Sequence, residues 1–216
     1  FNLLITGIGG LGVTSLGAIV GMAAHIEGHA VTAVDQQGLA QRGGGVDSHL
    51  RLRPPGFAPG GPRIPLGQAD VVIAADQVQA TGKSALPLMQ PARTAVFLNG
   101  DLTVTADFAL DTSQRFDQAA MKSRLGSAAR AVAELPASQL SRRYFGDTVY
   151  INMILLGVAW QAGTLPLSRA AIEEAIRLNG ADVQTNLRAF ALGRAQAAGR
   201  IPVDATATEG FDLDAF

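Results

Sequence analysis

Cysteine is absent from the 216 residues of this chain. Within these residues, that excludes disulfides, thiolate ligation of iron–sulfur clusters and a catalytic thiol. Histidine is almost as scarce, with three in all, and only His25 and His29 lie close together in the sequence. Because Gly28 separates them near the end of an expected helix, we interpret them as a polar pair at the helix end and not as metal ligands.

Excess charge and long apolar runs are missing as well. The formal net charge is −1, so electrostatic binding to nucleic acid or to an anionic membrane is not expected. The longest apolar run, 151–160, contains Asn152 and is too short to span a bilayer. With no secretory signal before the first apolar run, the sequence predicts a soluble, cytoplasmic protein. The start at Phe1, without Met and inside that run, indicates a domain cut from a longer chain or a processed or truncated form.

A glycine-rich turn separates the first apolar run from a helix-like stretch that begins near Val13. Gly7, Gly9 and Gly12 form the pattern GxGxxG, and Asp35 follows at the end of the next apolar run. Strand, glycine turn, helix, strand and terminal acid predict the first βαβ unit of a nucleotide-binding-like sheet. The glycines permit a tight turn and let a ligand phosphate or another part of the backbone approach the helix N-terminus.

Periodicity, capping residues and turn residues predict one α/β domain over residues 1–200, followed by an acidic tail or linker at 201–216. The expected fold class is a three-layer α/β/α Rossmann-like open sheet with a helical C-terminal portion. Strands are expected near 3–5 and over 31–35, 46–53, 69–75 and 94–98. Helices are expected over 11–27, 76–89, 116–135, 140–145, 148–162, 169–178 and 182–198, with Asp76, Asp147 and Ser168 as N-caps. Asn99-Gly100 fits either a hairpin turn into 102–105 or the exit loop of a parallel strand.

Residues 46–53 alternate between two faces. One face holds Val46, Ser48, Leu50 and Leu52, and the other holds Asp47, His49, Arg51 and Arg53. A strand with one polar face is an edge strand or lies beside a site. We interpret His49 as a hydrogen-bonded structural histidine in preference to a proton carrier. The next segment, 54–67, carries five prolines and four glycines, so we expect a loop whose length favours a functional or interfacial role.

Segments spread along the chain carry a resemblance to a known family: Gly7-Ile8-Gly9-Gly10-Leu11-Gly12-Val13, Gly38-Leu39-Ala40-Gln41-Arg42-Gly43-Gly44, Ser48-His49-Leu50-Arg51, Ala69-Asp70-Val71-Val72, Gly146-Asp147-Thr148, Leu178-Asn179-Gly180 and Asn186-Leu187-Arg188-Ala189-Phe190. In this order, they resemble the gamma domain of 2-oxoacid:ferredoxin oxidoreductases, with the closest likeness to the indolepyruvate (arylpyruvate) branch. The resemblance runs from about residue 3 to residue 195. The glycine turn alone is a weak signal, and its combination with the two following motifs is a strong one.

The resemblance implies an enzyme that oxidatively decarboxylates a 2-oxoacid with coenzyme A, using thiamine diphosphate, and passes electrons through iron–sulfur clusters to ferredoxin. It also implies that the thiamine and cluster sites lie on partner domains or subunits. This domain alone is then expected to hold no cofactor and no catalytic residue, and to work as part of an oligomer. The missing cysteines agree with that division. In the indolepyruvate branch, gamma domains can be fused at the C-terminal end of a large polypeptide, which would explain the start at Phe1.

Contacts to a cofactor are expected from the two glycine-rich segments, through Gly7, Gly9, Gly10, Gly12, Thr14, Gln41, Arg42, Gly43 and Gly44. Successive glycines let a loop press against a ligand or a neighbouring domain. The Arg42 guanidinium is a planar donor that suits a carboxylate or a phosphate. Coenzyme A and the entrance to the active site are therefore the expected neighbours of these segments.

Each assignment has a structural alternative. The glycines can serve only to pack a strand-to-helix turn, and Thr14 and Ser15 can donate to a phosphate or satisfy amides at the helix end. Asp35 can bind ribose hydroxyls or, as we favour, cap a loop at the strand end. Arg42 can pair with Asp35 or Asp47 instead of a ligand. The alternative function is an autonomous NAD(P)-binding enzyme or binding module, although no Tyr-x-x-x-Lys or well-placed His-Asp pair supplies acid–base chemistry.

Overall fold

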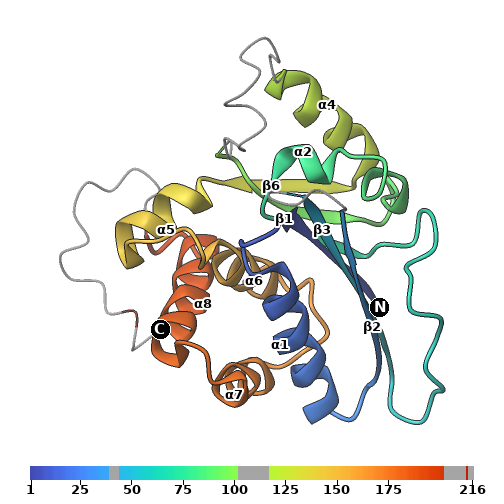
Figure 1. Ribbon diagram of the computed structural model, residues 1–216, viewed down its shortest axis with the longest axis vertical. Coiled ribbons are helices and arrows are strands. Elements are labelled where there is room, and N and C mark those ends of the chain that lie inside the picture. Colours follow the sequence, from blue (N-terminus) through green and yellow to red (C-terminus); the bar gives the residue numbers. More distant parts are fainter. Residues whose placement is uncertain (39–43, 102–116, 202–212, 214–216) are drawn as a thin grey trace.

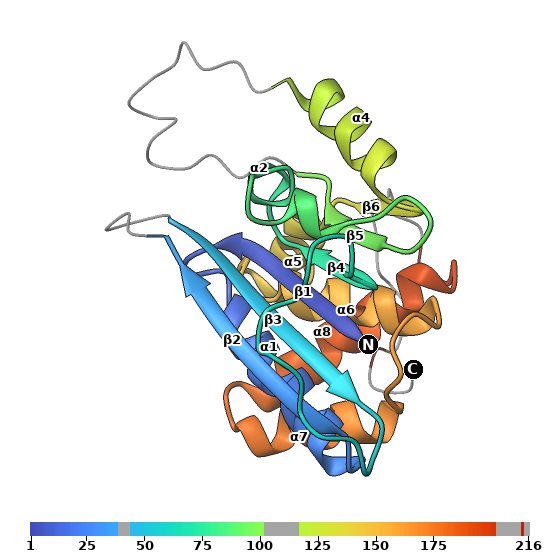
Figure 2. The same ribbon diagram turned by 90° about the vertical axis from the view of Figure 1, so that its right-hand side faces the viewer.

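The computed structural model describes residues 1–38, 44–101, 117–201 and 213. Six strands form one sheet in the order β2-β3-β1-β4-β5-β6. Their bounds are β1 (Asn2–Ile8), β2 (Ala30–Gln37), β3 (Gly45–Arg53), β4 (Val71–Ala74), β5 (Ala95–Asn99) and β6 (Ala131–Leu135). β1, β4, β5 and β6 run parallel to one another, whereas β3 is antiparallel to both of its neighbours (Figure 2).

Helices lie on both sides of this sheet (Figure 1). One side carries α1 (Val13–Ile26), α5 (Ala137–Phe145), α6 (Ile151–Gln161), α7 (Arg169–Asn179) and α8 (Val183–Ala197). The other side carries α2 (Gln77–Ala80), the 3-10 helix η1 (Leu86–Leu88) and α4 (Gln118–Ala128). Because side chains alternate along a strand, Leu3 and Ile5 of β1 join the first core and Leu4 joins the second. The predicted three-layer α/β/α class with a helical C-terminal portion is confirmed.

The first two strands are not neighbours in the sheet. β1, α1 and β2 follow one another as predicted, but β3 lies between the two strands, since Ile5 pairs with Ser48 and Ser48 pairs with Asp35. β1 and β2 are each antiparallel to β3, so they run parallel to each other, and the predicted βαβ unit is present with β3 inserted between its two strands. The same insertion pairs β3 along both edges, so of the two alternatives for 46–53 the edge strand is wrong and the strand beside a site stays a prediction. The predicted apolar face of β3 is confirmed, because Leu50 on that face is fully buried in the core that contains α1.

The polar face of β3 contacts the proline-rich segment 54–67. Arg51 Nη1 donates to the carbonyl of Gly61 at 2.7 Å, and the Ile64 amide donates to His49 Nδ1 at 3.3 Å. Nε2 of His49 lies 3.1 Å from Oε1 of Gln36 on β2. His49 is therefore bonded at both ring nitrogens and buried, as the structural interpretation predicted. A functional or interfacial role of the segment stays a prediction.

The helix expected over 76–89 is wrong in length. Asp76 caps α2 as predicted, accepting from the Gln79 amide at 2.9 Å, but α2 spans four residues. Gly82 favours helix poorly and Pro87 lacks an amide hydrogen. The chain therefore reaches β5 through turns and η1 instead of through a continuous helix.

The helix expected over 116–135 is also wrong at its C-terminal end. α4 stops at Ala128, and 131–135 form β6 in parallel pairing with β5. With β4 on its other side, β5 is paired along both edges, so Asn99-Gly100 is the exit of a parallel strand. Residues 102–105 of the hairpin alternative lie outside the described part of the chain.

The remaining C-terminal helices agree with prediction in position. Ser168 caps α7 by accepting from the Ala171 amide at 3.2 Å, and Gly180 ends that helix with φ +75°. The helix expected from residue 148 begins at Ile151, because Asp147 Oδ1 instead accepts from the Thr148 and Val149 amides of the preceding turn. The expected boundary between the domain and an acidic tail stays a prediction.

Two glycines allow α6 and α8 to cross at backbone contact. A Cβ added to Gly157 would lie 2.2 Å from the Phe190 carbonyl oxygen, and one added to Gly193 would lie 1.9 Å from the Ile154 carbonyl oxygen. Both distances are far too short for real atoms, so the two helices can approach this closely only because neither has a side chain at the contact. This crossing fixes α6, whose residues from Ile151 to Ala159 are all buried.

Replacing Gly193 with Ala is expected to lower the free energy of unfolding by about 3 kcal/mol, because the helices must separate or distort. Chemical denaturation followed by circular dichroism measures the change. The matched control is Gly126→Ala in α4, where a Cβ meets nothing within 4 Å. That control is expected to stabilise by about 0.5–1 kcal/mol through helix propensity. Equal effects of the two substitutions would contradict the close crossing.

Acidification is expected to destabilise the fold through His49. Burial lowers the pKa of this imidazole below its ordinary 6.5, although the charge of Asp47 acts in the opposite direction. Protonation also removes the acceptor that holds the Ile64 amide. Because the folded pKa lies below the unfolded one, the unfolded state takes up more protons as the pH falls below about 6.5. The free energy of unfolding should fall between pH 7.5 and pH 5.5, by at most about 1.4 kcal/mol per pH unit from this group.

His49→Gln is expected to remove this part of the pH dependence. The exposed His25 gives the matched control, since His25→Gln should leave the dependence unchanged. An identical loss of stability on acidification in wild type and His49→Gln would show that another group is responsible.

Candidate functional site

The glycine turn joins β1 to α1 at the carboxyl end of the parallel strands. Gly10 and Gly12 have φ values of +95° and +77°, a conformation that strains any residue with a Cβ. A Cβ on Gly10 would meet no atom within 4 Å. Glycine is therefore required here by the backbone conformation and not by lack of space for a side chain. Gly7 differs: its Cβ would lie 3.0 Å from Val13 Cγ2 and 3.1 Å from Ala75 Cβ, which is a packing role.

α1 begins at this turn without a capping side chain. Gly12 is the N-cap and provides no side chain, and the first turn of α1 contains no acidic residue. The Leu16 amide, bonded to the Gly12 carbonyl at 3.0 Å, makes the first helical hydrogen bond. Within the described part of the chain, the amides of Thr14 and Ser15 have no hydrogen-bond partner, as is usual at a helix N-terminus. Such an end attracts anions through both hydrogen bonding and its partial positive charge.

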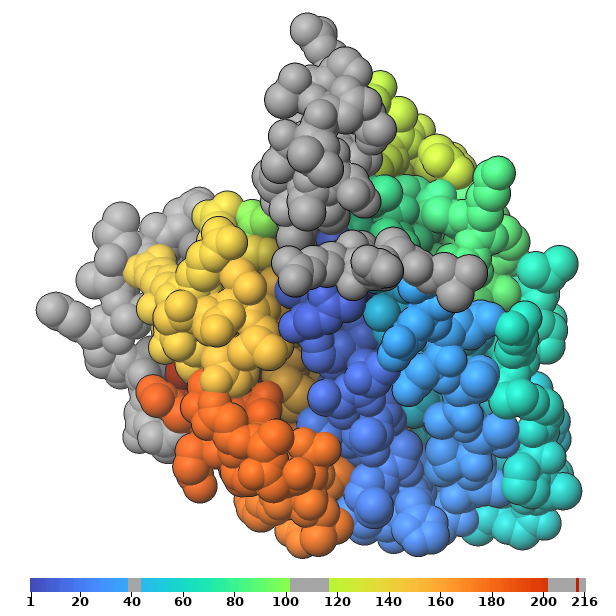
Figure 3. Space-filling view, viewed as in Figure 1, coloured from blue at the N-terminus to red at the C-terminus, as the bar shows by residue number. Residues whose placement is uncertain are grey.

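A cavity of about 490 Å³ opens over the turn, and we call it the turn cavity. Its walls contain four of the predicted site residues: Gly9, Gly10, Gly12 and Thr14. The cavity is also lined by Ser15, by Gln37 on β2 and by Val149 before α6. In the space-filling view, the blue N-terminal segment lies between the yellow and orange C-terminal helices and the lighter blue β2 (Figure 3).

The second glycine-rich segment meets the first one. The Gly38 amide donates to the Gly45 carbonyl at 2.8 Å, closing the antiparallel pair of β2 and β3. The Gly9 amide donates to the Gly44 carbonyl at 3.0 Å. The two segments are therefore joined by a backbone hydrogen bond at the edge of the turn cavity. Gln41, Arg42 and Gly43 lie outside the described residues, so their predicted contacts are not placed.

Asp35 is separated from the glycine turn by one strand. It is exposed on β2, and β3 lies between β2 and β1. In a dinucleotide-binding βαβ unit, the acid ends the strand adjacent to the one before the glycines. The spacing of the motif in the sequence matches that of a dinucleotide-binding unit, but Asp35 does not lie on the strand that such a unit requires. Asp47, the other suggested partner of Arg42, accepts from Thr6 Oγ1 at 2.5 Å.

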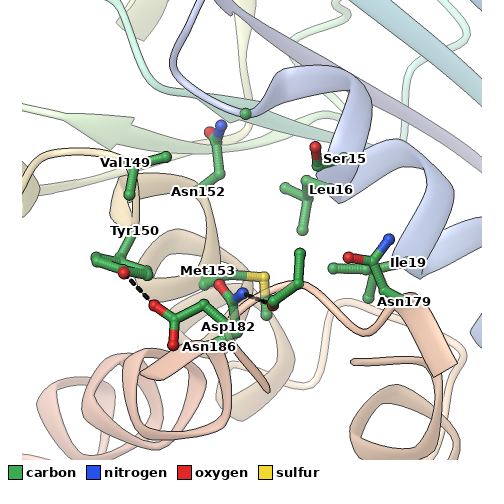
Figure 4. A pocket seen from close by; sticks show the side chains of 12 residues that line it. Ser15, Leu16, Ile19, Val149, Tyr150, Asn152, Met153, Asn179, Asp182 and Asn186 are labelled. Carbon is green, nitrogen blue, oxygen red and sulfur yellow. Dashed lines mark hydrogen bonds between the residues drawn. The ribbon is translucent and has the colours of Figure 1, made fainter. Parts of the chain in front are cut away.

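A second cavity lies on the other side of the turn, between α1, the start of α6 and the turn from α7 to α8 (Figure 4). We call it the α6 cavity. Asn152 Nδ2 reaches from α6 to the Leu11 carbonyl of the glycine turn at 2.6 Å. At the rim, the Tyr150 hydroxyl donates to Asp182, which raises the pKa of Tyr150 and lowers the pKa of Asp182.

Of the residues that line the α6 cavity, only Gly12 and Ser15 were candidate site residues from the sequence. Asn152 was noted only as an interruption of an apolar run, yet it is 2% exposed and is the single polar residue among Ile151–Ala159 of α6. Asp182 was taken as the start of the last helix. It is the one non-glycine residue with positive φ among those described, at +39°. A buried asparagine in an apolar helix was the available signal.

Other kinds of site find little support in the described residues. No group of three or more histidine, aspartate or glutamate side chains in ranges 1–38, 44–101 and 117–201 is arranged to hold a metal ion. In the same part of the chain, no helix combines the length and the apolar character needed to cross a bilayer.

Comparison with known proteins gives a consistent result. A family model described as pyruvate ferredoxin/flavodoxin oxidoreductase matches residues 2–196. The indolepyruvate oxidoreductase subunit IorB of Methanothermobacter thermautotrophicus is 30% identical over 204 residues, which cover 92% of this chain and 98% of the relative.

Solved structures show the same fold. The keto/oxoacid ferredoxin oxidoreductase gamma subunit of Geobacter sulfurreducens superposes with a TM-score of 0.64 at 20% identity, covering 92% of this chain and 99% of that one. The 2-oxoglutarate:ferredoxin oxidoreductase of Magnetococcus marinus, solved with 2-oxoglutarate, coenzyme A and succinyl-CoA, gives 0.62 at 18% identity over 95% of this chain and 32% of its own. Since the family model and the 30% identical relative each span most of the sequence, this chain belongs to the pyruvate ferredoxin/flavodoxin oxidoreductase family.

Proposed function

We propose that this chain is the gamma domain of a thiamine-diphosphate-dependent 2-oxoacid:ferredoxin oxidoreductase that acts on indolepyruvate or a related arylpyruvate. With its partners, the enzyme would oxidatively decarboxylate the 2-oxoacid to an acyl-CoA. Family membership supports the reaction class, and the names of relatives such as the Methanothermobacter subunit support the substrate. The domain would span residues 1–200 and work in the cytoplasm.

The observation that carries a binding role is the open helix end at the glycine turn. α1 starts without a capping side chain or an acidic residue, and the turn cavity lies directly over its first residues. A phosphate placed there would accept hydrogen bonds from the amides of Thr14 and Ser15 and from their hydroxyls. Gly10 leaves its side of the turn open, since no atom lies where its Cβ would be. These features fit a phosphate group of coenzyme A.

Coenzyme A would supply the thiol that accepts the acyl group. The residues of this chain would hold its phosphates and set its direction of entry. Arg42 would add a bidentate donor from the loop that ends at Gly44, whose carbonyl is bonded to the glycine turn. This role agrees with the coenzyme A present in the structurally similar Magnetococcus enzyme.

Electron transfer and carbanion chemistry would belong to partner domains or subunits. The chain has no cysteine to ligate an iron–sulfur cluster. The clusters would therefore sit on partners. The family resemblance implies the same for thiamine diphosphate, with ferredoxin as the final acceptor and an oligomer as the working unit. The chain alone would then be inactive.

Oxidation of indolepyruvate by the isolated chain, with coenzyme A and a ferredoxin or dye acceptor, is expected to stay at background. Turnover should appear when the partner subunits are added. A parallel titration with NADH should show no saturable binding, because Asp35 is not on the strand beside β1. Tight NADH binding would favour the autonomous NAD-binding alternative, and turnover without partners and thiamine diphosphate would rule out the proposed division of labour.

In the assembled enzyme, Arg42→Ala and Thr14→Val are each expected to raise the KM for coenzyme A by about ten-fold, because the first removes charge-assisted hydrogen bonds to a phosphate and the second removes a hydroxyl donor. The KM for the arylpyruvate should change less than two-fold. Arg142→Ala on α5, an exposed arginine, is the matched control and should leave both values unchanged. Unaltered steady-state kinetics of Arg42→Ala, with assembly intact, would assign this loop an architectural role.

A further inference from the structure

A pocket with a strongly charged lining lies between α7 and α8, which pack side by side (Figure 1). Its volume is about 260 Å³. We call it the arginine pocket, and its charged residues are Arg169, Glu173 and Arg177 of α7 and Arg188 and Arg194 of α8. Those of α7 recur every four residues and so share one face of the helix. With four guanidinium groups and one carboxylate, the lining carries an excess of positive charge that attracts an anion.

The carboxylate of the pocket is shared between two arginines. Glu173 Oε1 accepts from Arg169 Nε at 2.5 Å, and its Oε2 lies 3.8 Å from Arg177 Nη2. Arg194 is only 7% exposed, and its guanidinium stacks over the Trp160 ring at 5.0 Å. Burial and the charge of Arg169 lower the pKa of Arg194, and Glu173 acts in the opposite direction. A further carboxylate in the pocket would offset this repulsion between arginines.

The acidic segment after α8 returns to this pocket at one leucine. Leu213 lines the pocket, is 6% exposed and belongs to the same core as Ile172 and Phe190. Its neighbours in the sequence are Asp212 and Asp214. Because consecutive Cα atoms lie about 3.8 Å apart, the buried leucine brings both acids to the pocket. Residues 201–216 contain four acids and no lysine or arginine, so the charge of the segment is opposite to that of the lining.

We propose that the arginine pocket is the docking site of the chain's own acidic segment, with Leu213 as the apolar anchor and Asp212 and Asp214 as the ion-pairing groups. The segment is then bound to α7 and α8 and is not a free tail or linker. Because the anchor is apolar and the flanking groups are charged, salt weakens only part of the attachment. This inference does not rest on the proposed function, since it concerns neither the glycine turn nor coenzyme A.

Cleavage by chymotrypsin measures this docking in the full chain, because Phe211 and Leu213 are cleavage sites within the segment. Each rate is divided by the rate for a synthetic peptide of residues 202–216 with the same substitutions, and mass spectrometry identifies the bond that is cut. The unmodified chain should be cut at least about ten-fold more slowly than its peptide. Asp212→Asn combined with Asp214→Asn should speed up cleavage of the full chain about five-fold, because two charge pairs are lost.

Asp204→Asn combined with Glu209→Gln is the matched control, since it makes the same charge change further from Leu213. It should alter the rate by less than about two-fold. Arg188→Ala should also speed up cleavage. Its effect together with the double substitution at 212 and 214 should be smaller than the product of the two separate effects, because both remove the same pairs.

The proposal is overturned if the unmodified chain is cut as fast as its peptide, since the segment is then not docked. It is equally overturned if the double substitution at 212 and 214 leaves the rate unchanged, since Leu213 then holds the segment alone. Independent effects of Arg188→Ala and that double substitution would also overturn it, because the acids would then pair elsewhere and the pocket would be left to an anion from another molecule.

Discussion

The backbone contact between α6 and α8 is the constraint on which both cavities depend. Only glycine at positions 157 and 193 lets each helix approach the carbonyl groups of the other. Held in this way, α6 lies along the sheet with its first turn against the glycine turn, where Asn152 bonds the Leu11 carbonyl. The same contact brings the start of α8, with Asp182, to the start of α6. The close packing of α6 against α8 in the core thus determines how the residues around the two cavities are arranged.

The insertion of β3 gives the site its second component. Because β2 and β3 form an antiparallel pair beside β1, the connection between them ends next to the glycine turn, where the Gly9 amide bonds the Gly44 carbonyl. If β2 lay directly beside β1, the connection that follows β2 would begin one strand closer to the glycine turn. Asp35 would then occupy the position that binds ribose in dinucleotide-binding folds. The inserted strand therefore separates Asp35 from the glycine turn and brings the Gly44 carbonyl beside that turn. This arrangement is the physical reason to prefer a phosphate-binding role over a dinucleotide site.

Features with local causes could be predicted from the sequence. The glycine turn, the Ser168 cap and the glycine that ends α7 depend on residues a few positions apart, and the structure has all three. β6 could not be predicted, because four of its five residues are exposed and its pairing with β5 is a long-range contact. The insertion of β3 leaves the spacing of the GxGxxG motif unchanged, so the motif carries no information about it.

The candidate site could be predicted only in part. Gly9, Gly10, Gly12 and Thr14 line the turn cavity, and their contact with a cofactor stays a prediction, whereas Gly7 packs against Val13 and Ala75. Asn152 was noted only as an interruption of an apolar run, because a lone asparagine in an apolar helix signals a buried polar group but not the residue that it contacts.

We propose that the open start of α1 receives a phosphate of coenzyme A within a multisubunit enzyme. A crystal structure of the chain assembled with its partner subunits and coenzyme A is the most direct test. A coenzyme A phosphate should then lie within hydrogen-bonding distance of the Thr14 and Ser15 amides, in the turn cavity. Coenzyme A bound wholly on the partner subunits, with the glycine turn covered by protein, would contradict it.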